Sequence, residues 1–283
     1  MRRMGAKREF DSMTTIRVLL AGCGNMGYAM LSGWISSGKL DAKETLVVEP
    51  NAELRERAAR LGSKAVASAD DIAADAAPEL IVIAVKPQVI RDVVAGYRRF
   101  TSKATFLSVA AGTPINTFEE ILGSDTSVMR CMPNTPAAIG KGMMVTFANP
   151  HVAATMQDFV ADLLSASGEV ATIEDEGLMD AVTAVSGSGP AYVFHFIECL
   201  TAAGEKAGLP SDTAKLLAMQ TVYGAASLAA ESMEEPGTLR QQVTSPNGTT
   251  AAALAVLMGE DRLKLLVGEA VEAARARSVE LGR

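Results

Sequence analysis

Histidine and cysteine are scarce in this chain of 283 residues, and their scarcity narrows the chemistry that it can perform. The two histidines are His151 and His195, and the three cysteines, Cys23, Cys131 and Cys199, lie far apart. A sparse and odd set of cysteines forms neither a disulfide framework nor a metal-ligand pattern. Two histidines likewise give little material for a zinc site or a Ser-His-Asp triad. We therefore expect no metal, and a location in the reducing cytoplasm.

Positive charge, aromatic side chains and long apolar runs are also in short supply. The formal net charge is −7, and aromatic residues make up 5% of the chain. Nucleic-acid-binding domains usually carry a basic stripe, and a membrane-spanning helix needs about 20 mostly apolar residues in a row. The sequence has neither, so we expect neither nucleic acid nor a membrane as a partner. Residues 1–14 are polar and lack the apolar segment of a signal peptide, so we expect a flexible extension there.

Short β-type runs alternate with helical segments in the first half of the chain. The predicted strands are 16–21, 45–49, 80–85, 104–109 and 127–132, with 143–147 and 169–173 as an outer pair. The run Leu80–Val85 is apolar throughout, as expected of a strand that is covered on both faces. This alternation predicts an α/β Rossmann-type doubly wound, mostly parallel sheet over residues 15–173.

Beyond about Glu174 the pattern is helical only. The predicted helices are 175–185, 190–207, 211–231, 237–243, 249–258 and 260–281. Pro190 and Pro236 suit first helical turns, and Gly208 can close a helix before Pro210. We therefore assign residues 174–283 to an all-α domain.

One predicted helix, Ala191–Ala207, is apolar around most of its circumference. A surface helix of a globular protein shows a single apolar stripe, so this helix has to be buried. A small helical domain has little interior of its own. We expect burial against the same helices of a second copy, in a homodimer; the alternative is a helix buried within its own monomer.

The strongest local motif is Gly22-x-Gly24-x-x-Gly27, which lies between a predicted strand and a predicted helix. In dinucleotide-binding folds the glycines allow a tight turn, approach of the pyrophosphate and close packing of helix on strand. An acidic residue, Glu49, ends the next strand roughly 20 residues further on, where such folds bind the adenosine ribose. The motif predicts a dinucleotide site made by Gly22, Cys23, Gly24, Asn25, Met26, Gly27 and Glu49; the alternative is an ordinary glycine-rich turn.

Two further loops follow predicted strands. Val85, Lys86 and Pro87 come at the carboxyl end of 80–85, where open α/β sheets bind their ligands. The segment Met132–Pro136 contains two prolines, and we expect this stiff loop to hold Asn134 near a nicotinamide. Lys86 is equally well explained as a solvated loop charge, and the proline loop as a rigid turn.

The helical half contains two loops rich in hydroxyl groups and glycine. One, Ser186–Pro190, precedes the apolar helix. Glycines flank Ser188, so its hydroxyl group is available to a ligand without large neighbouring side chains. The other, Thr244–Thr250, contains an Asn-Gly pair suited to positive φ and opens a helix, whose amino end is a ready site for a carboxylate. A helix cap without a ligand is the alternative interpretation.

Together these segments resemble the pyrroline-5-carboxylate reductase family. The matching segments are LLAGCGNMGYAM, IVIAVKPQ, RCMPNTPA, AVSGSGPAYVF and QQVTSPNGTTAAAL, in order from about Ile16 to the carboxyl end. The resemblance implies a Rossmann domain followed by a helical dimerisation domain with interleaved helices, often assembled into rings of dimers. It also implies reduction of an imino acid, 1-pyrroline-5-carboxylate, to L-proline by NADPH or NADH.

The resemblance further implies roles for single residues. Gly22, Gly24 and Gly27 hold the pyrophosphate, and Lys86 and Pro87 lie beside the cofactor. The substrate carboxylate is bound by the loop of Ser245, Asn247, Gly248, Thr249 and Thr250, and Thr250 reaches the ring nitrogen and helps to bring it a proton. The family pattern usually has a glycine where this chain has Asn247.

Two other functions compete with this interpretation. A β-hydroxyacid dehydrogenase commonly has a catalytic lysine after its glycine-rich turn, whereas SGSGPAYVF has none. A dinucleotide-sensing module would not need the loop 245–250. The preferred cofactor is also open: Glu49 favours NADH, but Pro50 could turn it outward, and Arg55 or Arg57 could receive the phosphate of NADPH.

Overall fold

The computed structural model describes residues 16–282, so the extension predicted for residues 1–14 lies outside the described residues. The chain forms two compact units. The first extends to Met179 and includes Leu281 near the carboxyl end, and the second is Asp180–Glu280. The sequence pattern predicts the division near Ile173, a few residues earlier.

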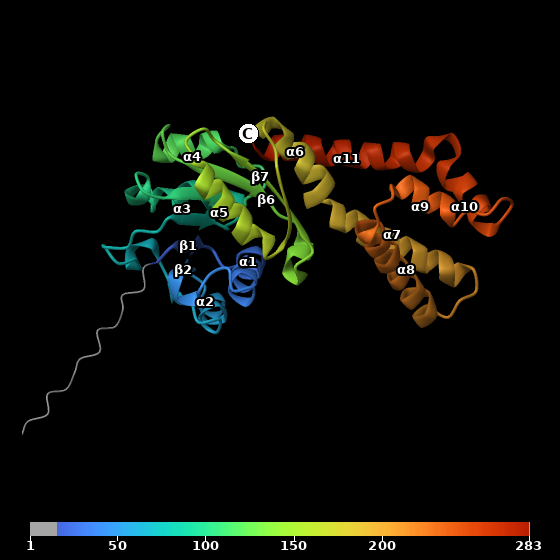
Figure 1. Cartoon of the computed structure of the whole chain (residues 1–283), viewed down its shortest axis with the longest axis horizontal. Coiled ribbons are helices and arrows are strands. Elements are labelled where there is room, and N and C mark those ends of the chain that lie inside the picture. The colour runs from blue at the N-terminus through green and yellow to red at the C-terminus, as the bar shows by residue number, and fades with distance from the viewer. Residues whose placement is uncertain (1–15, 283) are drawn as a thin grey trace, which may run out of the picture. The chain divides into compact units, whose positions relative to one another are not determined.

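The first unit contains the sheet to which the labelled strands β1, β2, β6 and β7 of Figure 1 belong. The sheet has eight strands in the order β3-β2-β1-β4-β5-β6-β7-β8. All neighbours are parallel except β6 and β7. The strands are β1 Val18–Ala21, β2 Thr45–Val48, β3 Lys64–Val66, β4 Leu80–Ile83, β5 Thr105–Ser108, β6 Val128–Met132, β7 Gly142–Ala148 and β8 Gly168–Thr172. The strand order reverses between β1 and β4, and open α/β sheets bind ligands at the carboxyl ends beside such a reversal.

Helices cover both faces of this sheet. They are α1 Asn25–Ser36, α2 Ala52–Ala59, α3 Ile90–Ala95, α4 Ile115–Leu122 and α5 Ala154–Ser165. Alternate residues of a strand point to opposite faces, so β1 contributes Val18 and Leu20 to one apolar cluster and Leu19 and Ala21 to the other. The first cluster includes side chains of α1 and α5, and the second includes those of α3 and α4. Full burial of a large aliphatic side chain stabilises the folded state by roughly 1.5–3 kcal/mol. The two clusters contain many such side chains, so the first unit has a core of its own.

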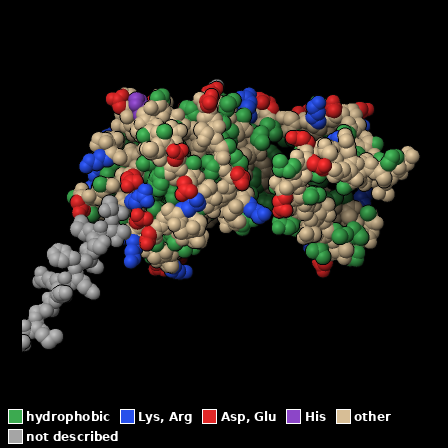
Figure 2. All heavy atoms as spheres, viewed as in Figure 1, with side chains coloured by type: hydrophobic (Ala, Val, Ile, Leu, Met, Phe, Trp, Pro, Cys, Tyr) green, Lys and Arg blue, Asp and Glu red, His purple; other side chains and the backbone are tan. Residues whose placement is uncertain are grey.

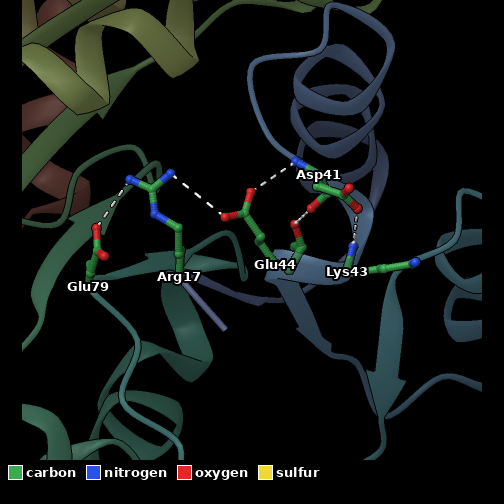
Figure 3. Close-up of polar contacts among 6 residues, drawn as sticks. Arg17, Asp41, Lys43, Glu44 and Glu79 are labelled. Atoms are coloured by element: carbon green, nitrogen blue, oxygen red, sulfur yellow. Dashed lines mark hydrogen bonds and ion pairs between the residues drawn. The ribbon is translucent and has the colours of Figure 1, made fainter. Parts of the chain in front are cut away.

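Polar contacts join the segments that lead into the amino ends of β1, β2 and β4 (Figure 3). Arg17 Nη2 lies 3.3 Å from Glu79 Oε2, and its Nη1 lies 4.0 Å from Glu44 Oε1. Asp41 accepts a hydrogen bond from the Lys43 backbone and donates its own backbone N–H to Glu44. Partly exposed ion pairs of this kind contribute about 0–1 kcal/mol each to stability. They lie at the amino ends of the strands, whereas the turn Gly22–Gly27 follows the carboxyl end of β1, so we assign them a structural role.

The second unit is helical. After α6 Met179–Val182 a π-helical turn, Thr183–Gly187, leads into α7 Gly189–Lys206. The remaining helices are α8 Ser211–Glu231, α9 Pro236–Gln242, α10 Thr249–Met258 and α11 Arg262–Leu281. The predicted fold class, a Rossmann-type sheet followed by an all-α domain, is confirmed. Within residues 16–282 no helix is long and apolar enough to cross a membrane.

The second unit buries very little. Of the described residues 180–280, those classed as buried are Ala184, Ala214, Ala218 and Ser278. Large apolar side chains reach the surface instead, including Phe194 of α7, which is 59% exposed, and Leu216 of α8; hydrophobic side chains are visible over this unit in Figure 2. The alternative that α7 is buried within its own monomer is therefore wrong, because the unit lacks the side chains to enclose it.

Candidate active site

The glycine turn after β1 needs glycine at two positions. Gly22 has φ +92°, and a Cβ there would lie 2.7 Å from the carbonyl oxygen of Ala84. A Cβ on Gly27 would collide with the carbonyl oxygen of Gly22. Helix α1 begins at Asn25, and its N-cap, Gly24, has no side chain with which to occupy the first N–H groups. These donors are left for an anion such as a pyrophosphate.

A groove of about 640 Å³ opens beside this turn, at the carboxyl ends of β1, β2 and β4. It brings together five of the residues predicted for the cofactor: Gly22, Gly24, Glu49, Val85 and Lys86. Its other walls are mainly apolar and include Leu54, Val89, Val93 and Tyr97. Part of the wall, Ala67–Asp70, follows β3, a strand that the sequence pattern did not predict. A groove of this volume, with an apolar wall and open N–H groups at one side, suits a dinucleotide.

Glu49 points toward the glycine turn. The residue is 7% exposed. Its Oε2 accepts a hydrogen bond of 2.7 Å from the Cys23 N–H, and its Oε1 accepts one of 2.9 Å from the Asn51 N–H. Pro50 therefore does not turn the carboxylate outward into solvent, and Glu49 forms part of the wall of the groove.

Two arginines of α2 bind backbone carbonyl groups around Glu49. Arg57 Nη2 donates to the carbonyl oxygens of Cys23, at 2.9 Å, and Gly24, at 3.1 Å, while its guanidinium lies 4.0 Å from the centre of the Tyr28 ring. Arg55 Nη1 donates to the carbonyl oxygens of Glu49 and Pro50. The peptide groups of Cys23 are thus held by Glu49 on one side and by Arg57 on the other. The sequence pattern gave no signal for Tyr28, and indicated the arginines only as phosphate ligands.

The cysteine inside the glycine turn is not a nucleophile. Burial raises the pKa of the Cys23 thiol to about 11, although the positive charge of Arg57 acts in the opposite direction. Burial also raises the pKa of Cys131, to about 12. Only the thiolate is reactive, so both thiols are inert at neutral pH. Within the described residues no group of three or more His, Cys, Asp or Glu side chains is arranged to hold a metal ion.

The other predicted cofactor residues lie around the glycine turn and the neighbouring loops. Lys86 is exposed and precedes a short 3-10 turn that begins at Pro87. Asn25 lines a second hollow, with Tyr28 and Ala137, and Met26 is half-buried in the first turn of α1. Asn134 Oδ1 accepts a hydrogen bond of 2.9 Å from the Met143 N–H, which joins its loop to β7. This contact gives Asn134 a structural role, and its place beside a nicotinamide stays a prediction.

The predicted substrate loop lies in the second unit. Asn247 has φ +60°, the positive value that its Asn-Gly pair predicts, and the Gly248 N–H donates to the Ser245 carbonyl at 3.1 Å. Helix α10 begins at Thr249 after a glycine N-cap, so its first N–H groups are not occupied by an N-cap side chain. Thr250 is half-buried, and Thr249 is exposed. Ser188 lies where the π-helical turn meets α7, and its N–H donates to the Thr183 carbonyl.

Comparison with known families identifies both halves of the chain. Residues 176–281 match a family model described as pyrroline-5-carboxylate reductase dimerisation, and residues 15–112 match one described as NADP oxidoreductase, coenzyme F420-dependent. A pyrroline-5-carboxylate reductase of Pseudomonas aeruginosa is 40% identical over 271 residues, which cover 95% of this chain and 98% of that protein. This chain belongs to the pyrroline-5-carboxylate reductase family.

Other members of the family, from distant organisms, are similar over the same length. A reductase of this name from Arabidopsis thaliana is 37% identical, over 95% of this chain and 96% of the relative. The solved structure of a pyrroline-5-carboxylate reductase from Coxiella burnetii is 33% identical, with a TM-score of 0.88 over 95% of this chain and 99% of that chain. The Plasmodium falciparum pyrroline carboxylate reductase, solved with NADP bound, is 31% identical, with a TM-score of 0.82 over 96% and 100%. Resemblance to the family, expected from five short segments, therefore extends over nearly the whole chain.

Proposed function

We propose that this chain is a pyrroline-5-carboxylate reductase, an oxidoreductase that reduces the C=N bond of 1-pyrroline-5-carboxylate and forms L-proline with NADPH or NADH. One observation carries the proposal. A chain of this family combines a groove suited to a dinucleotide, beside Gly22–Gly27, with a helix, α10, whose amino end after Asn247-Gly248 is open to a carboxylate. A β-hydroxyacid dehydrogenase is not favoured, since the family match includes the helical half of the chain.

The residues of the first unit fit a nicotinamide dinucleotide. Neighbouring backbone carbonyl groups lie so close to Gly22 and Gly27 that neither position has room for a side chain. The open N–H groups of α1 suit the pyrophosphate. We assign Gly22–Gly27 to the pyrophosphate, Glu49 to the adenosine ribose, and Val85, Lys86, Pro87 and Asn134 to the rest of the cofactor. The reduced nicotinamide supplies the hydride.

The loop of the second unit suits the imino acid. Backbone N–H groups of Thr249 and Thr250 at the start of α10 bind the carboxylate, because a helix amino end favours negative charge. The Gly248 N–H donates to the Ser245 carbonyl, so Gly248 contributes by shaping the loop. Ser245, Asn247 and Ser188 complete this site. The imine is itself a strong electrophile when protonated, so positioning contributes more than acid catalysis does.

Thr250 acts at the ring nitrogen. When hydride adds to the carbon of the protonated imine, the electron pair of the C=N π bond moves to nitrogen, and the proton already on nitrogen becomes the N–H of the amine. The Thr250 hydroxyl can donate a hydrogen bond to nitrogen or accept one from it. Together with water it can therefore keep a proton at that atom throughout the transfer.

The exposed apolar helices support a homodimer, assembled singly or as a ring of dimers. Phe194, Phe196 and Leu200 on α7, and Leu216 and Met219 on α8, are large and exposed. Apolar surface on this scale marks an interface in soluble proteins. A second copy of the same unit is the occupant that the dimerisation match favours. Sedimentation at low micromolar concentration should give a dimer or a multiple of it; a stable and fully active monomer would overturn this part of the proposal.

The cell compartment is proposed to be the cytoplasm. The three cysteines are unpaired, and two of them are buried. Free buried thiols suit a reducing compartment.

A three-part assay tests the proposed reaction. Purified chain is given pyrroline-5-carboxylate with each reduced cofactor, a set of β-hydroxyacids with each oxidised cofactor, and each cofactor alone. The proposal expects cofactor oxidation and an equal amount of proline in the first part. Oxidation of a hydroxyacid would favour a dehydrogenase, and cofactor binding without either reaction would favour a sensing module.

A further inference from the structure

The two nicotinamide cofactors differ by one phosphate group, on the 2′ oxygen of the adenosine ribose. In open α/β folds this ribose lies at the carboxyl end of the second strand, beside the glycine turn. Here β2 ends at Val48, and Glu49 follows it at the wall of the groove. The side chains around Glu49 therefore decide which of the two cofactors fits.

The Glu49 carboxylate is held in place as an acceptor. Its two oxygens accept the N–H groups of Cys23 and Asn51, at 2.7 Å and 2.9 Å. A carboxylate oxygen has two acceptor sites, so each oxygen keeps the capacity to accept one ribose hydroxyl. A phosphate in the same position has no proton to donate at neutral pH, and brings negative charge against the carboxylate.

The cations nearest to Glu49 are already engaged. Arg55 donates to the carbonyl oxygens of Glu49 and Pro50, and Arg57 donates to those of Cys23 and Gly24 while it stacks on Tyr28. Each arginine commits one guanidinium nitrogen to these bonds, Arg55 its Nη1 and Arg57 its Nη2. Neither arginine is among the residues that line the groove.

The rest of the groove offers no better partner for a phosphate. Among its lining residues Lys86 is the one cation, and it follows β4, which is separated from β2 by β1. The ends of β2 and β4 are therefore two strand spacings apart, which amounts to roughly 10 Å. The other charged residues of the wall are acids, Asp70 and Asp92. At the start of α2 the Asn51 N–H is bound by Glu49, and the Leu54 N–H by the Asn51 side chain.

We infer that this chain selects NADH over NADPH, and that Glu49 is the residue that determines the choice. The inference rests on the proposed reduction of an imine and names the cofactor that supplies its hydride. Glu49 accepts the ribose hydroxyls of NADH and repels the 2′-phosphate of NADPH. Arg55 and Arg57 hold the backbone and do not bind the phosphate.

Direct binding of each cofactor tests the inference without any imine present. The dissociation constants of NADH and NADPH are measured by nicotinamide fluorescence with the full chain. We expect NADPH to bind at least tenfold more weakly than NADH. Glu49→Gln, which removes the charge and keeps one oxygen acceptor, and Glu49→Ser should each shift the ratio toward NADPH by tenfold or more, equivalent to about 1.4 kcal/mol. Tighter binding of NADPH by the wild type, or a ratio unchanged in both variants, would overturn the inference.

Matched variants separate Glu49 from general charge and from the arginines. Glu53→Gln removes an exposed carboxylate in the first turn of α2, outside the groove, and should leave the ratio unchanged. A shift equal to that of Glu49→Gln would contradict a specific role. Arg55→Met should not weaken NADPH binding selectively; if it does, Arg55 binds the phosphate and the inference fails. Since the readout is binding, a failure here is distinct from a failure to form proline.

Discussion

The two units solve the problem of burying apolar side chains in different ways. The first encloses two clusters on the two faces of its sheet, with Trp34 and Phe118 among the fully buried side chains. The second leaves Phe194, Leu216 and many other large apolar residues exposed. A sheet that is covered by helices on both faces buries its apolar side chains within one chain. Helices that are apolar on several sides can be buried only by additional helices, which this unit does not have. The first unit is therefore built to stand alone, and the second is built to be covered.

The same difference extends to the two predicted sites. The glycine turn of the first unit is fixed by contacts between distant parts of the chain, from Glu49 and Arg57 to Cys23. The loop of the second unit is shaped by a short-range bond, Gly248 N–H to Ser245 carbonyl, and by the local conformation of Asn247. Cofactor binding should therefore depend on the fold of one chain, and substrate binding on a unit that needs its partner.

The largest effect is expected from a charge on the exposed face of α7. Phe194→Glu would place a carboxylate in the proposed interface, and burial of an unpaired charge is strongly unfavourable. We expect dissociation to monomers and at least a hundredfold loss of proline formation, with cofactor binding largely kept because the groove belongs to the first unit. Sedimentation and NADH fluorescence measure the two outcomes.

Lys206→Glu is the control for this variant. It changes the charge of an exposed residue that is already charged, at the end of the same helix, and should leave a dimer. A Phe194→Glu protein that remains dimeric would break the comparison between the two units.

A pair of glycine variants tests the first unit. Gly27→Ala forces a methyl group against the Gly22 carbonyl and should lower both the melting temperature and cofactor affinity, the latter by about a hundredfold, on the order of 2.7 kcal/mol. Gly24→Ala meets no atom within 4 Å in the protein, so it should keep its stability and still lose affinity, because the methyl group occupies the approach of the pyrophosphate. Full affinity in both variants would remove the turn from the cofactor site.

Thr250 is the sharpest test of the second unit. Loss of its hydroxyl in Thr250→Ala should lower kcat/KM by about ten- to a hundredfold, on the order of 1.4–2.7 kcal/mol, with cofactor affinity unchanged. Thr249→Ala is matched to it, since it keeps the backbone N–H proposed for the carboxylate and removes a hydroxyl to which we assign no role. Equal kcat/KM values for the two variants would show that the Thr250 hydroxyl does not act at the ring nitrogen.

The smallest effect is expected from the loop position where this chain departs from the family pattern. Asn247→Gly should change the free energy of unfolding by less than about 1 kcal/mol, because glycine adopts φ +60° as readily as Asn does. Asn247→Ala should cost about 1 kcal/mol more, since a Cβ without a local hydrogen-bonding group disfavours this region. Chemical denaturation of both variants checks the order, and a more stable Ala variant would contradict it.

Local chemistry explains which features were predictable from the sequence. The helices Ser211–Glu231 and Thr249–Met258 begin and end as predicted, and the positive φ of Asn247 follows from its own side chain and the glycine after it. Strand β3 was missed because its three residues, Lys64–Val66, are too few and too exposed to give a pattern.

Contacts between distant residues explain what the sequence could not show. The compact units divide after Met179, later than the predicted Ile173, and the intervening Glu176 accepts hydrogen bonds from Arg130 and from the Ile115 N–H of the first unit. The direction of Glu49 and the engagement of Arg57 likewise depend on Cys23, which lies more than twenty residues away in the chain. No local pattern contains that information.

Transfer of an isotopic label tests the central claim most directly. The full chain is incubated with pyrroline-5-carboxylate and with NADH or NADPH that carries deuterium at both positions of C4 of the nicotinamide, and the product is examined by mass spectrometry and NMR. The account predicts L-proline with one deuterium on the ring carbon that was the imine carbon, beside nitrogen and remote from the carboxylate. Folded protein that binds cofactor but forms no proline, or forms proline without deuterium at that carbon, would contradict it.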